Sequence, residues 1–489
     1  MSEVKVNKLS PRSGTTVTIG DSGDTITTVA SLNVNGGTIK LDGNYPTGTA
    51  NVALGDTALD SVEAGATCNV AIGANALTAN TTGDNNTAVG FKSLTSNTTA
   101  DNNTAVGNLA LCCNTTGAEN TAVGIQALCK TTTGCRNTAV GASSLVCNTE
   151  GCQNVAMGRL AMRCNTTGDD NVGIGVSALS ANTTADDNTA VGQESLNANT
   201  TGVSNTAVGR SALKRNTTAS NNTAVGMNSL CANTTGTSNA AFGHLALNAN
   251  TTASDNTAIG RESLPVNTTG CMNTGLGQGT LFKNTTGDNN TAVGRHALLC
   301  NTTADNNTAV GFESLKLNTT GDQNVAIGSN ALDANTTADN NVAIGHGSLT
   351  SATADGNVAV GSLAGLSLTT GHSHVALGFC ALYTATTGEG NTALGNGALK
   401  LTTTASDNTA VGRRALCTNS TGANNVSVGA YSLCLNTTAT GNVAVGHSAL
   451  KSATTGSYNV GMGVNAIHCV TTGGGNVAIG QGTATGLTT

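Results

Sequence analysis

Short apolar runs recur along most of the chain at a nearly constant spacing. The segments NTAVGFKSL, from residue 86, and NTAVGNLAL, from residue 103, lie seventeen residues apart. The phrase occurs in 26 copies between residues 51 and 489, and Asn opens all of them except the copy that begins at His374. The step is 18 residues once, after Asn51, and 16 residues once, after Asn341. Self-similarity at a short fixed period predicts a repeat architecture.

The positions of each copy are numbered 1 to 17 from that Asn. Positions 2 to 4 read Thr or Val, a tiny residue, and a larger apolar residue, and position 5 is Gly in every copy. Position 9 is Leu in most copies. The alternation over positions 2 to 4 has the period of a β-strand. We expect a strand, a corner at the Gly, a second short strand and a polar turn, forming one coil of a parallel β-solenoid or β-roll.

Stacking of like coils explains the fidelity of the repeat, because each residue of a solenoid lies above its counterpart one coil earlier. We expect Asn ladders at positions 1 and 12, with His374 the one departure at position 1. The Gly of position 5 indicates either a positive φ or close approach of a neighbouring backbone. Position 15 interchanges Gly and Ala, as in Gly202 and Ala219. We therefore expect no positive φ there, and Gly202→Ala to be nearly silent.

Positions 4 and 9 are apolar in nearly every copy and are expected to form the core. Position 2, which is Thr or Val, contributes an apolar side chain in only some of the copies. At about 1.5–3 kcal/mol per buried side chain, these gain little against backbone entropy of roughly 1–2 kcal/mol per residue. The tiny residues of position 3 offer a surface that another chain can approach closely. We therefore expect a tightly packed homo-oligomer. The alternative is a flat single-chain solenoid whose two sheets meet through small residues.

Composition narrows the class of protein. The chain has no Trp, 2% aromatic residues and 10% charged residues, so it lacks the material of an ordinary core. Its net charge of −7 and dispersed Lys and Arg give no reason to expect nucleic acid. No apolar run approaches the roughly 20 residues of a membrane span. No apolar stretch follows the first basic residues, so we expect no secretory signal.

The repeats divide the chain into two regions. Residues 1–50 alternate Thr, Val and Ile with Gly, Asp and Ser. We interpret them as a β-rich attachment region. Residues 51–489 form the predicted solenoid shaft of 26 coils, which makes the fold class all-β.

Two segments resemble known families. NVAIGANAL, residues 69–77, resembles the head repeats of trimeric autotransporter adhesins, although the Asn-Thr-Thr turn makes each copy longer. That resemblance implies left-handed β-rolls of three chains around one axis, and hence a homotrimeric fibre. Residues 5–28 look like the opening of tail-fibre or appendage proteins of marine bacteriophages. This likeness implies a virion fibre that contacts other virion proteins through its N-terminal region, binds a host surface receptor, and reaches the outside by lysis.

No catalytic constellation stands out, and we expect a non-enzymatic structural protein. Ser, His and Asp are scattered over the variable positions that follow the Gly. Arg261 and Arg413 occupy the same positions in their copies, and we interpret these positions as solvated outer corners. Two other functions stay open: a cellular adhesive or extracellular filament, and an ice-binding solenoid. The paired threonines, such as Thr81 and Thr82, are adjacent, so a strand would split them between its faces. This pattern disfavours a flat ice-binding face.

The chain has fifteen cysteines, and some recur at the repeat spacing. Four pairs are separated by one repeat: Cys112/Cys129, Cys135/Cys152, Cys147/Cys164 and Cys417/Cys434. Equivalent positions on adjacent coils would place Cα atoms about 4.8 Å apart, within the range for a disulfide. The alternative is that Cys acts as a small apolar filler, which the odd total favours.

His372 and His374 raise the possibility of one metal site. Residues two apart in a strand face the same side. If three chains met on an axis there, six imidazoles would converge, enough for an octahedral transition metal. The pair resembles the His-x-His iron sites of some phage fibres and spikes. The alternative is two solvent-facing histidines in a polar turn, and we expect no other cofactor.

Overall fold

The computed structural model describes residues 49–63 and 65–486. The chain divides into two units between Tyr45 and Pro46, and only the second is described below. The attachment region predicted for residues 1–50 lies almost wholly outside the described residues, and it stays a prediction.

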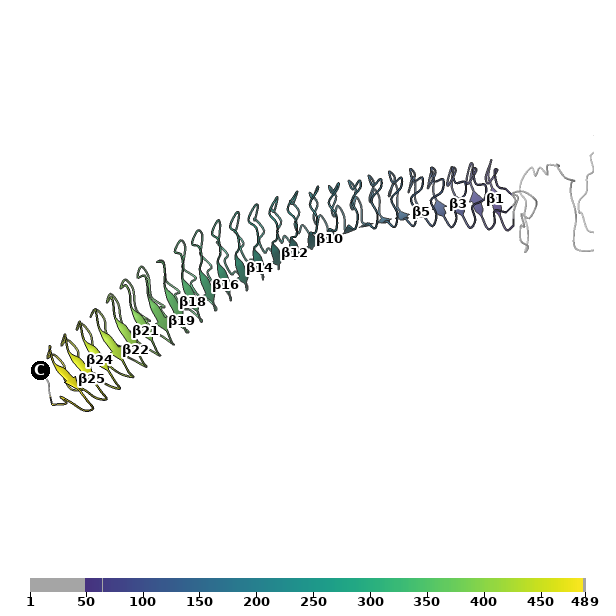
Figure 1. The fold of residues 1–489 in the computed structure, drawn as a ribbon. Helices are drawn as coiled ribbons and strands as arrows, with labels where there is room; N and C mark the ends of the chain where they lie inside the picture. The colour runs from purple at the N-terminus through teal and green to yellow at the C-terminus, as the bar shows by residue number, and fades with distance from the viewer. Residues whose placement is uncertain (1–48, 64, 487–489) are drawn as a thin grey trace, which may run out of the picture. The chain divides into compact units, whose positions relative to one another are not determined.

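Each coil contributes one strand of three residues to a single sheet, and the described residues hold 26 strands and no helix. Each strand pairs in parallel with the next strand of the chain, so the coils follow one another in one row (Figure 1). The strands are β1 Val52–Leu54, β2 Val70–Ile72, β3 Thr87–Val89, β4 Thr104–Val106, β5 Thr121–Val123, β6 Thr138–Val140, β7 Val155–Met157, β8 Val172–Ile174, β9 Thr189–Val191, β10 Thr206–Val208, β11 Thr223–Val225, β12 Ala240–Phe242, β13 Thr257–Ile259, β14 Thr274–Leu276, β15 Thr291–Val293, β16 Thr308–Val310, β17 Val325–Ile327, β18 Val342–Ile344, β19 Val358–Val360, β20 Val375–Leu377, β21 Thr392–Leu394, β22 Thr409–Val411, β23 Val426–Val428, β24 Val443–Val445, β25 Val460–Met462 and β26 Val477–Ile479.

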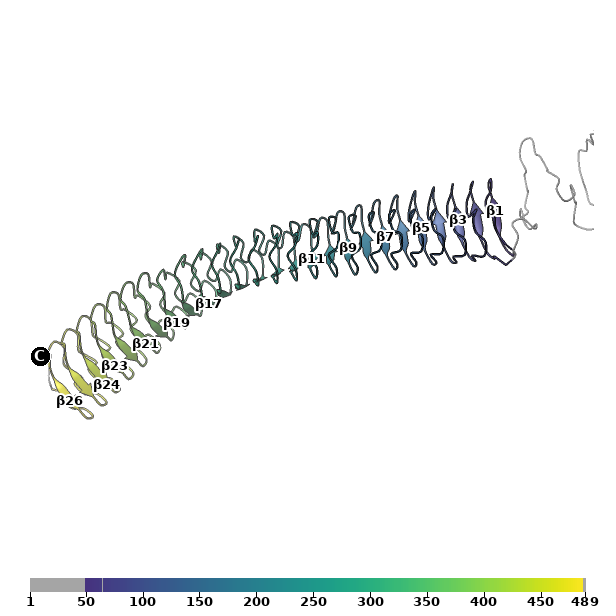
Figure 2. The same ribbon diagram turned by 45° about the horizontal axis from the view of Figure 1, so that its top comes forward.

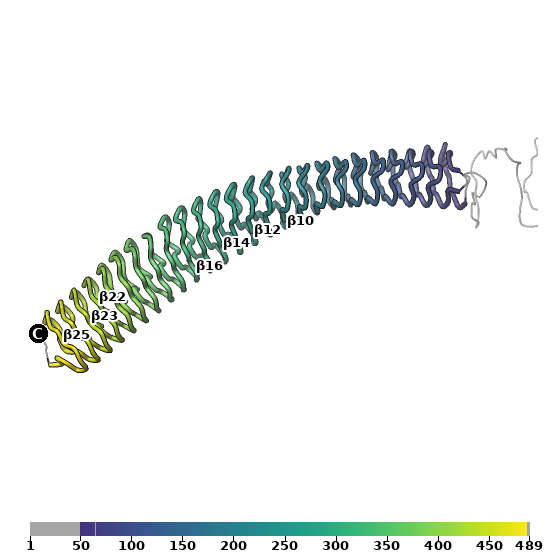
Figure 3. The backbone as a smooth tube through the Cα atoms, viewed as in Figure 1, coloured from purple at the N-terminus to yellow at the C-terminus, as the bar shows by residue number. Residues whose placement is uncertain are grey.

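The register of the sheet survives both irregular copies. Val52 pairs with Val70 across the 18-residue step, and Val342 pairs with Val358 across the 16-residue step. The length difference is absorbed by the polar turn between strands, while the strands stay stacked (Figures 2 and 3). The predicted all-β, parallel β-solenoid is therefore confirmed.

The predicted second strand is wrong. Lys92 and Leu94, at positions 7 and 9, have φ of 54° and 49°, in the left-handed region that an extended strand cannot contain. This segment still bonds to both neighbouring coils: Lys92 N–H donates to Ala74 O in the preceding coil and Leu94 N–H to Ala110 O in the next, both at 3.0 Å. Turns thus replace the second strand. The second sheet of the single-chain alternative is therefore not formed by the described residues, which hold a single sheet.

The core of each coil combines position 9 with the small residues of positions 3 and 8. Leu94 and Ala88 are fully buried. Position 3 must be small because it faces the position 9 side chain of the preceding coil: a Cβ on Gly173 would lie 2.7 Å from Cγ of Met162. The prediction that position 3 forms an open surface for another chain is therefore wrong.

Two columns of buried Asn side chains run beside this core. At position 1, Asn103 N–H donates to Oδ1 of Asn86 at 3.0 Å. At position 12, Asn97 Nδ2 donates to Oδ1 of Asn80 at 2.9 Å. The amides link coil to coil and satisfy buried backbone groups, which would otherwise be costly. Both predicted Asn ladders are confirmed, although position 12 between residues 80 and 470 carries another residue in seven coils, at Thr131, Ala352, Leu368, Ala385, Thr402, Ala453 and Val470.

The two Gly-rich positions differ in backbone conformation. Gly209, at position 5, has φ of 129°, and a Cβ there would lie 2.7 Å from the carbonyl carbon of Gly226. Both explanations offered for this Gly therefore hold. Gly202, at position 15, has no positive φ, as predicted. A Cβ on Gly202 would nevertheless overlap the carbonyl oxygen of Ala219, so the prediction that Gly202→Ala is nearly silent is wrong.

Candidate interaction face

The outward side chains of positions 2 and 4 form one continuous surface, which we call the sheet face. Position 2 is Thr or Val in every copy except Ala240, and position 4 is Val, Ile, Leu, Met or Phe throughout. Neither position carries a charge in any of the 26 copies. Val106 and Val123, at position 4 of neighbouring coils, are each 37% exposed. The sheet face is therefore an uncharged stripe along the whole row of strands, apolar at position 4 and mixed Thr and Val at position 2.

The outward direction of position 4 corrects the prediction that it belongs to the core. Positions 2 and 4 share one side of a three-residue strand, and position 3 points to the other. The interior side is already filled by the position 9 side chains and the two Asn columns, so only a tiny residue fits there. A usable signal was present in the sequence: position 3 departs from Ala only to Gly or Ser, as in Gly173 and Ser427.

The size of the sheet face follows from strand geometry. Twenty-five steps of about 4.8 Å give a length of roughly 120 Å, and two outward side chains per strand give a width of about 7 Å. The projected area is about 800 Å². Soluble monomers rarely expose apolar patches larger than a few hundred Å². A stable protein–protein interface buries about 800 Å² per partner.

The variable residues after the Gly lie at the corners of the coils, as predicted. Arg261, Arg413 and Arg414 are exposed. The Arg413 guanidinium lies 4.7 Å from the ring centroid of Tyr431, on the next coil. The side chains that vary most between copies thus lie at the corners, and the sheet face is nearly the same in every copy.

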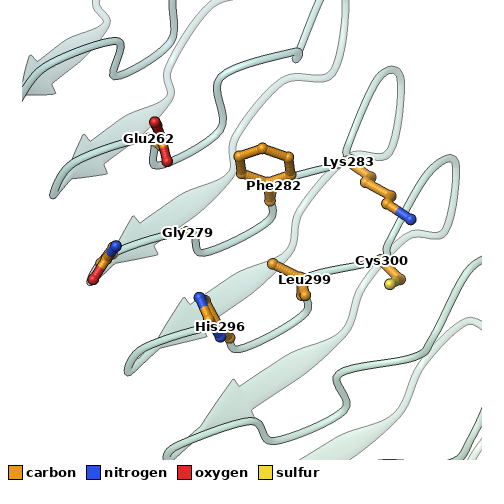
Figure 4. A pocket seen from close by; sticks show the side chains of 8 residues that line it. Glu262, Gly279, Phe282, Lys283, His296, Leu299 and Cys300 are labelled. Atoms are coloured by element: carbon orange, nitrogen blue, oxygen red, sulfur yellow. The ribbon is translucent and has the colours of Figure 1, made fainter.

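One of these corners is hollowed. Gly279 has no side chain at position 7, and a Cβ there would lie 2.9 Å from Cδ2 of His296. Figure 4 shows Phe282 and Leu299 reaching in from neighbouring coils beside His296. The hollow has a volume of about 260 Å³ and is lined by Glu262, Gln278, Gly279, Phe282, Lys283, His296, Leu299 and Cys300. An apolar floor with a rim of both charges can accept a small ligand with one apolar face and polar edges.

The structure separates the two histidines of the predicted metal pair. His374 is buried inside the coil, where Nε2 lies 2.6 Å from Gly388 O and Nδ1 accepts from Asn391 N–H. His372 is exposed and lies 3.2 Å from a carboxylate oxygen of Glu389. The premise that both imidazoles face one side of a strand is therefore wrong, because both histidines precede β20, which begins at Val375. Among the described residues, no group of three or more His, Cys, Asp or Glu is arranged to hold a metal ion.

The one-repeat cysteine pairs differ in the direction of their side chains. Cys112 and Cys129 have Sγ atoms 3.0 Å apart, and Cys135 and Cys152 have theirs 2.8 Å apart. Cys417 and Cys434 are also equivalent neighbours at position 10, and the Cys434 thiol lowers the pKa of Cys417 to about 7. The structure brings no sulfur–sulfur contact to the pair Cys147/Cys164 in the described part of the chain. Equal spacing along the chain thus gives contact only at positions 10 and 16, and not at position 11.

The paired threonines are split, as the sequence suggested. Thr98 Oγ1 donates to Thr115 O, in the next coil, at 3.2 Å. The adjacent Thr99 is exposed. One hydroxyl of each pair thus bonds to the next coil. Only the other Thr of the pair faces outward, so the polar turns present a single column of outward Thr side chains.

No protein-family model matches the chain, and a search of curated proteins finds no match. Among the described residues, no helix is long and apolar enough to span a membrane. The sheet face, the corners and the thiol pairs are therefore what the chain itself offers for an assignment of function.

Proposed function

We propose that this chain is the shaft subunit of a fibrous, non-enzymatic assembly in which copies of the chain pack together through the sheet face. The observation that carries the proposal is the absence of any charge from positions 2 and 4 in all 26 copies. A surface left in water has no reason to exclude Lys, Glu and Asp over roughly 120 Å. Burial against equivalent faces gives that reason.

The sheet faces of two copies can pack together because their strands repeat at the same spacing. The pair of outward side chains on one strand is called a rung. Each rung presents a β-branched or aliphatic pair, such as Thr104 and Val106, at the same rise along the row. Copies that run in the same direction can therefore match rung to rung over the whole length. Three copies around one axis is the number that the likeness to trimeric adhesin heads implies.

The biological setting that we propose is a bacteriophage tail fibre or another virion appendage. The N-terminal region would hold the fibre to other virion proteins, and the exposed corners would meet a receptor on the host surface. The variety of side chains at positions 6 and 7, which include Arg261 and Arg413, supports the corners as the contact surface. An extracellular adhesive filament shares the same assembly and differs only in its setting.

The test is the mass of the assembly by sedimentation, compared between two triple variants. The first places Glu on the sheet face of alternate coils: Val106→Glu, Val140→Glu and Ile174→Glu. Alternate coils avoid stacking the new carboxylates on one another. The wild-type residues are 37%, 38% and 36% exposed. We expect the wild type to sediment as an oligomer and this variant to sediment as a monomer.

The matched control places Glu on exposed apolar residues away from the sheet face: Ile125→Glu, Val176→Glu and Val203→Glu. These residues are 59%, 44% and 37% exposed, so the added charge is comparable. The control should keep the wild-type mass. A monomeric wild type, or equal dissociation of both variants, would contradict the proposal. A monomer that also slows ice growth would favour the ice-binding alternative.

A further inference from the structure

Two thiol pairs join neighbouring coils at contact distance. Cys112 and Cys129 occupy position 10 of successive coils, and Cys135 and Cys152 occupy position 16. Their Sγ atoms are 3.0 Å and 2.8 Å apart, respectively. All four are free thiols in this structure. Stacked coils hold their Cα atoms about 4.8 Å apart, inside the window of 4.4–6.8 Å typical of disulfides.

A third pair repeats the arrangement near the other end of the shaft. Cys417 and Cys434 occupy position 10 of successive coils, as Cys112 and Cys129 do, and each is 9% exposed. A fourth pair at the same spacing serves as a comparison for the three proposed disulfides. Cys147 and Cys164 have the same spacing at position 11, where Sγ of Cys147 lies 4.0 Å from Nζ of Lys130. Their thiols do not meet, although the coils that carry them are stacked in the same way.

We propose that Cys112–Cys129, Cys135–Cys152 and Cys417–Cys434 are oxidised to disulfides that staple neighbouring coils when the shaft meets a low-molecular-weight disulfide such as oxidised glutathione. Cys147 and Cys164 remain thiols under the same conditions. The thiols stay reduced in a reducing cytoplasm. The disulfides therefore form after the shaft leaves that compartment, and they stabilise the stacked coils without any change of fold.

The chemistry balances as a thiol–disulfide exchange. The Cys129 thiolate attacks one sulfur of the external disulfide, which forms a mixed disulfide and releases one thiolate. Cys112 then loses its proton and attacks Sγ of Cys129, which closes the intrachain bond and releases the second thiolate. Two protein thiols are oxidised, and one external disulfide is reduced to two thiols. The other pairs follow the same scheme.

The environment of each pair assigns the attacking thiol. The hydrogen bond from Cys112 lowers the pKa of Cys129 to about 7, and the bond from Cys434 lowers the pKa of Cys417 to about 7. Burial raises the pKa of Cys152 to about 11. Since the thiolate is the nucleophile, Cys129 and Cys417 are the attacking thiols of the two position 10 pairs.

The test uses the full-length assembly treated with oxidised glutathione, digested without reduction and analysed by mass spectrometry. We expect crosslinked peptides that join the three proposed pairs and none that joins Cys147 to Cys164. The crosslinked chain should keep the size of one chain on a denaturing, non-reducing gel, because each bond lies within a chain. Absence of all three links would overturn the proposal. A Cys112–Cys113 link in place of Cys112–Cys129 would overturn it for that pair, since these two sulfurs lie 3.7 Å apart.

A second measurement keeps the proposal testable if digestion is incomplete. Amide exchange should show that local opening of the stapled coils becomes roughly 100-fold rarer on oxidation, the effect of closing a loop of this length. Reduction with dithiothreitol should reverse the change. The variant Cys129→Ser/Cys152→Ser/Cys434→Ser should lose the effect, and Cys147→Ser/Cys164→Ser should retain it. Equal protection in both variants would count against the assignment.

Discussion

The backbone N–H of Asn391 donates a hydrogen bond to Nδ1 of His374, one coil earlier, at 3.2 Å. Nε2 of the same imidazole lies 2.6 Å from the carbonyl oxygen of Gly388. These are the two bonds that an Asn amide makes elsewhere in the position 1 ladder, as in Asn391 itself. The ring takes over both only when it is neutral, with its proton on Nε2, because a protonated Nδ1 cannot accept.

This relationship predicts an acid-sensitive coil. Burial lowers the pKa of His374, and the titratable groups nearest to it are His372 and Glu389. A group whose folded pKa is depressed contributes stability above its unfolded value, roughly 6.5 for His, and loses it as the pH falls. We expect the free energy of local opening around residues 371–391, measured by amide exchange, to fall by up to about 1.4 kcal/mol per pH unit below that value.

Two single variants isolate the buried imidazole. His374→Asn restores the ladder amide and should remove the acid-dependent loss. His372→Asn changes only an exposed ring and should keep it. An unchanged pH profile in the first variant would show that another group is responsible.

The Asn ladder predicts a large difference between two asparagines of one coil. Asn103 is buried, and its Oδ1 accepts from Asn120 N–H at 2.9 Å. Asn108 is exposed at the corner. Asn103→Ala should lower the free energy of local opening by about 1–3 kcal/mol, because the buried N–H of Asn120 loses its acceptor. Asn108→Ala should change it by less than about 0.5 kcal/mol. Similar amide-exchange protection of Asn120 in both variants would show that the ladder does not hold the coils together.

The two kinds of Gly predict a graded response to Ala. Gly202→Ala and Gly209→Ala both push a Cβ against the backbone of the next coil. Only Gly209 must also hold a positive φ, 129°. Thermal unfolding should therefore show both variants destabilised, with Gly209→Ala worse by about 1–2 kcal/mol. The reverse order would mean that steric contact, and not backbone conformation, determines the tolerance of these positions.

The sequence was enough to predict that the coils stack in register, but it was misleading about which side of each strand faces the interior. A strict period places like residues above like, so the parallel coils and both Asn ladders follow from the repeat alone. Alternation shows that positions 2 and 4 share a side but not which side is inside, and the larger residue was assigned to the core. Val106 is instead outside, and Ala105, beside it, is buried. The interior is too narrow for more than one large side chain per coil.

Two features depended on backbone detail that residue types do not reveal. Leu94 has φ of 49°, a conformation that Leu disfavours in isolation and that hydrogen bonding to both neighbouring coils imposes. This turn replaces the expected second strand. The direction of each cysteine follows from such turns, so equal spacing could not distinguish Cys112/Cys129, which meet, from Cys147/Cys164, which do not.

A cross-section of the purified assembly by cryo-electron microscopy tests the central proposal most directly. We predict more than one chain in the section, with the strands turned toward a shared axis and the side chains of Val106 and its equivalents buried between copies. The corners that carry Arg261 and Arg413 should lie on the outside. A section with one chain, or with several chains whose sheet faces are open to solvent, would contradict the account.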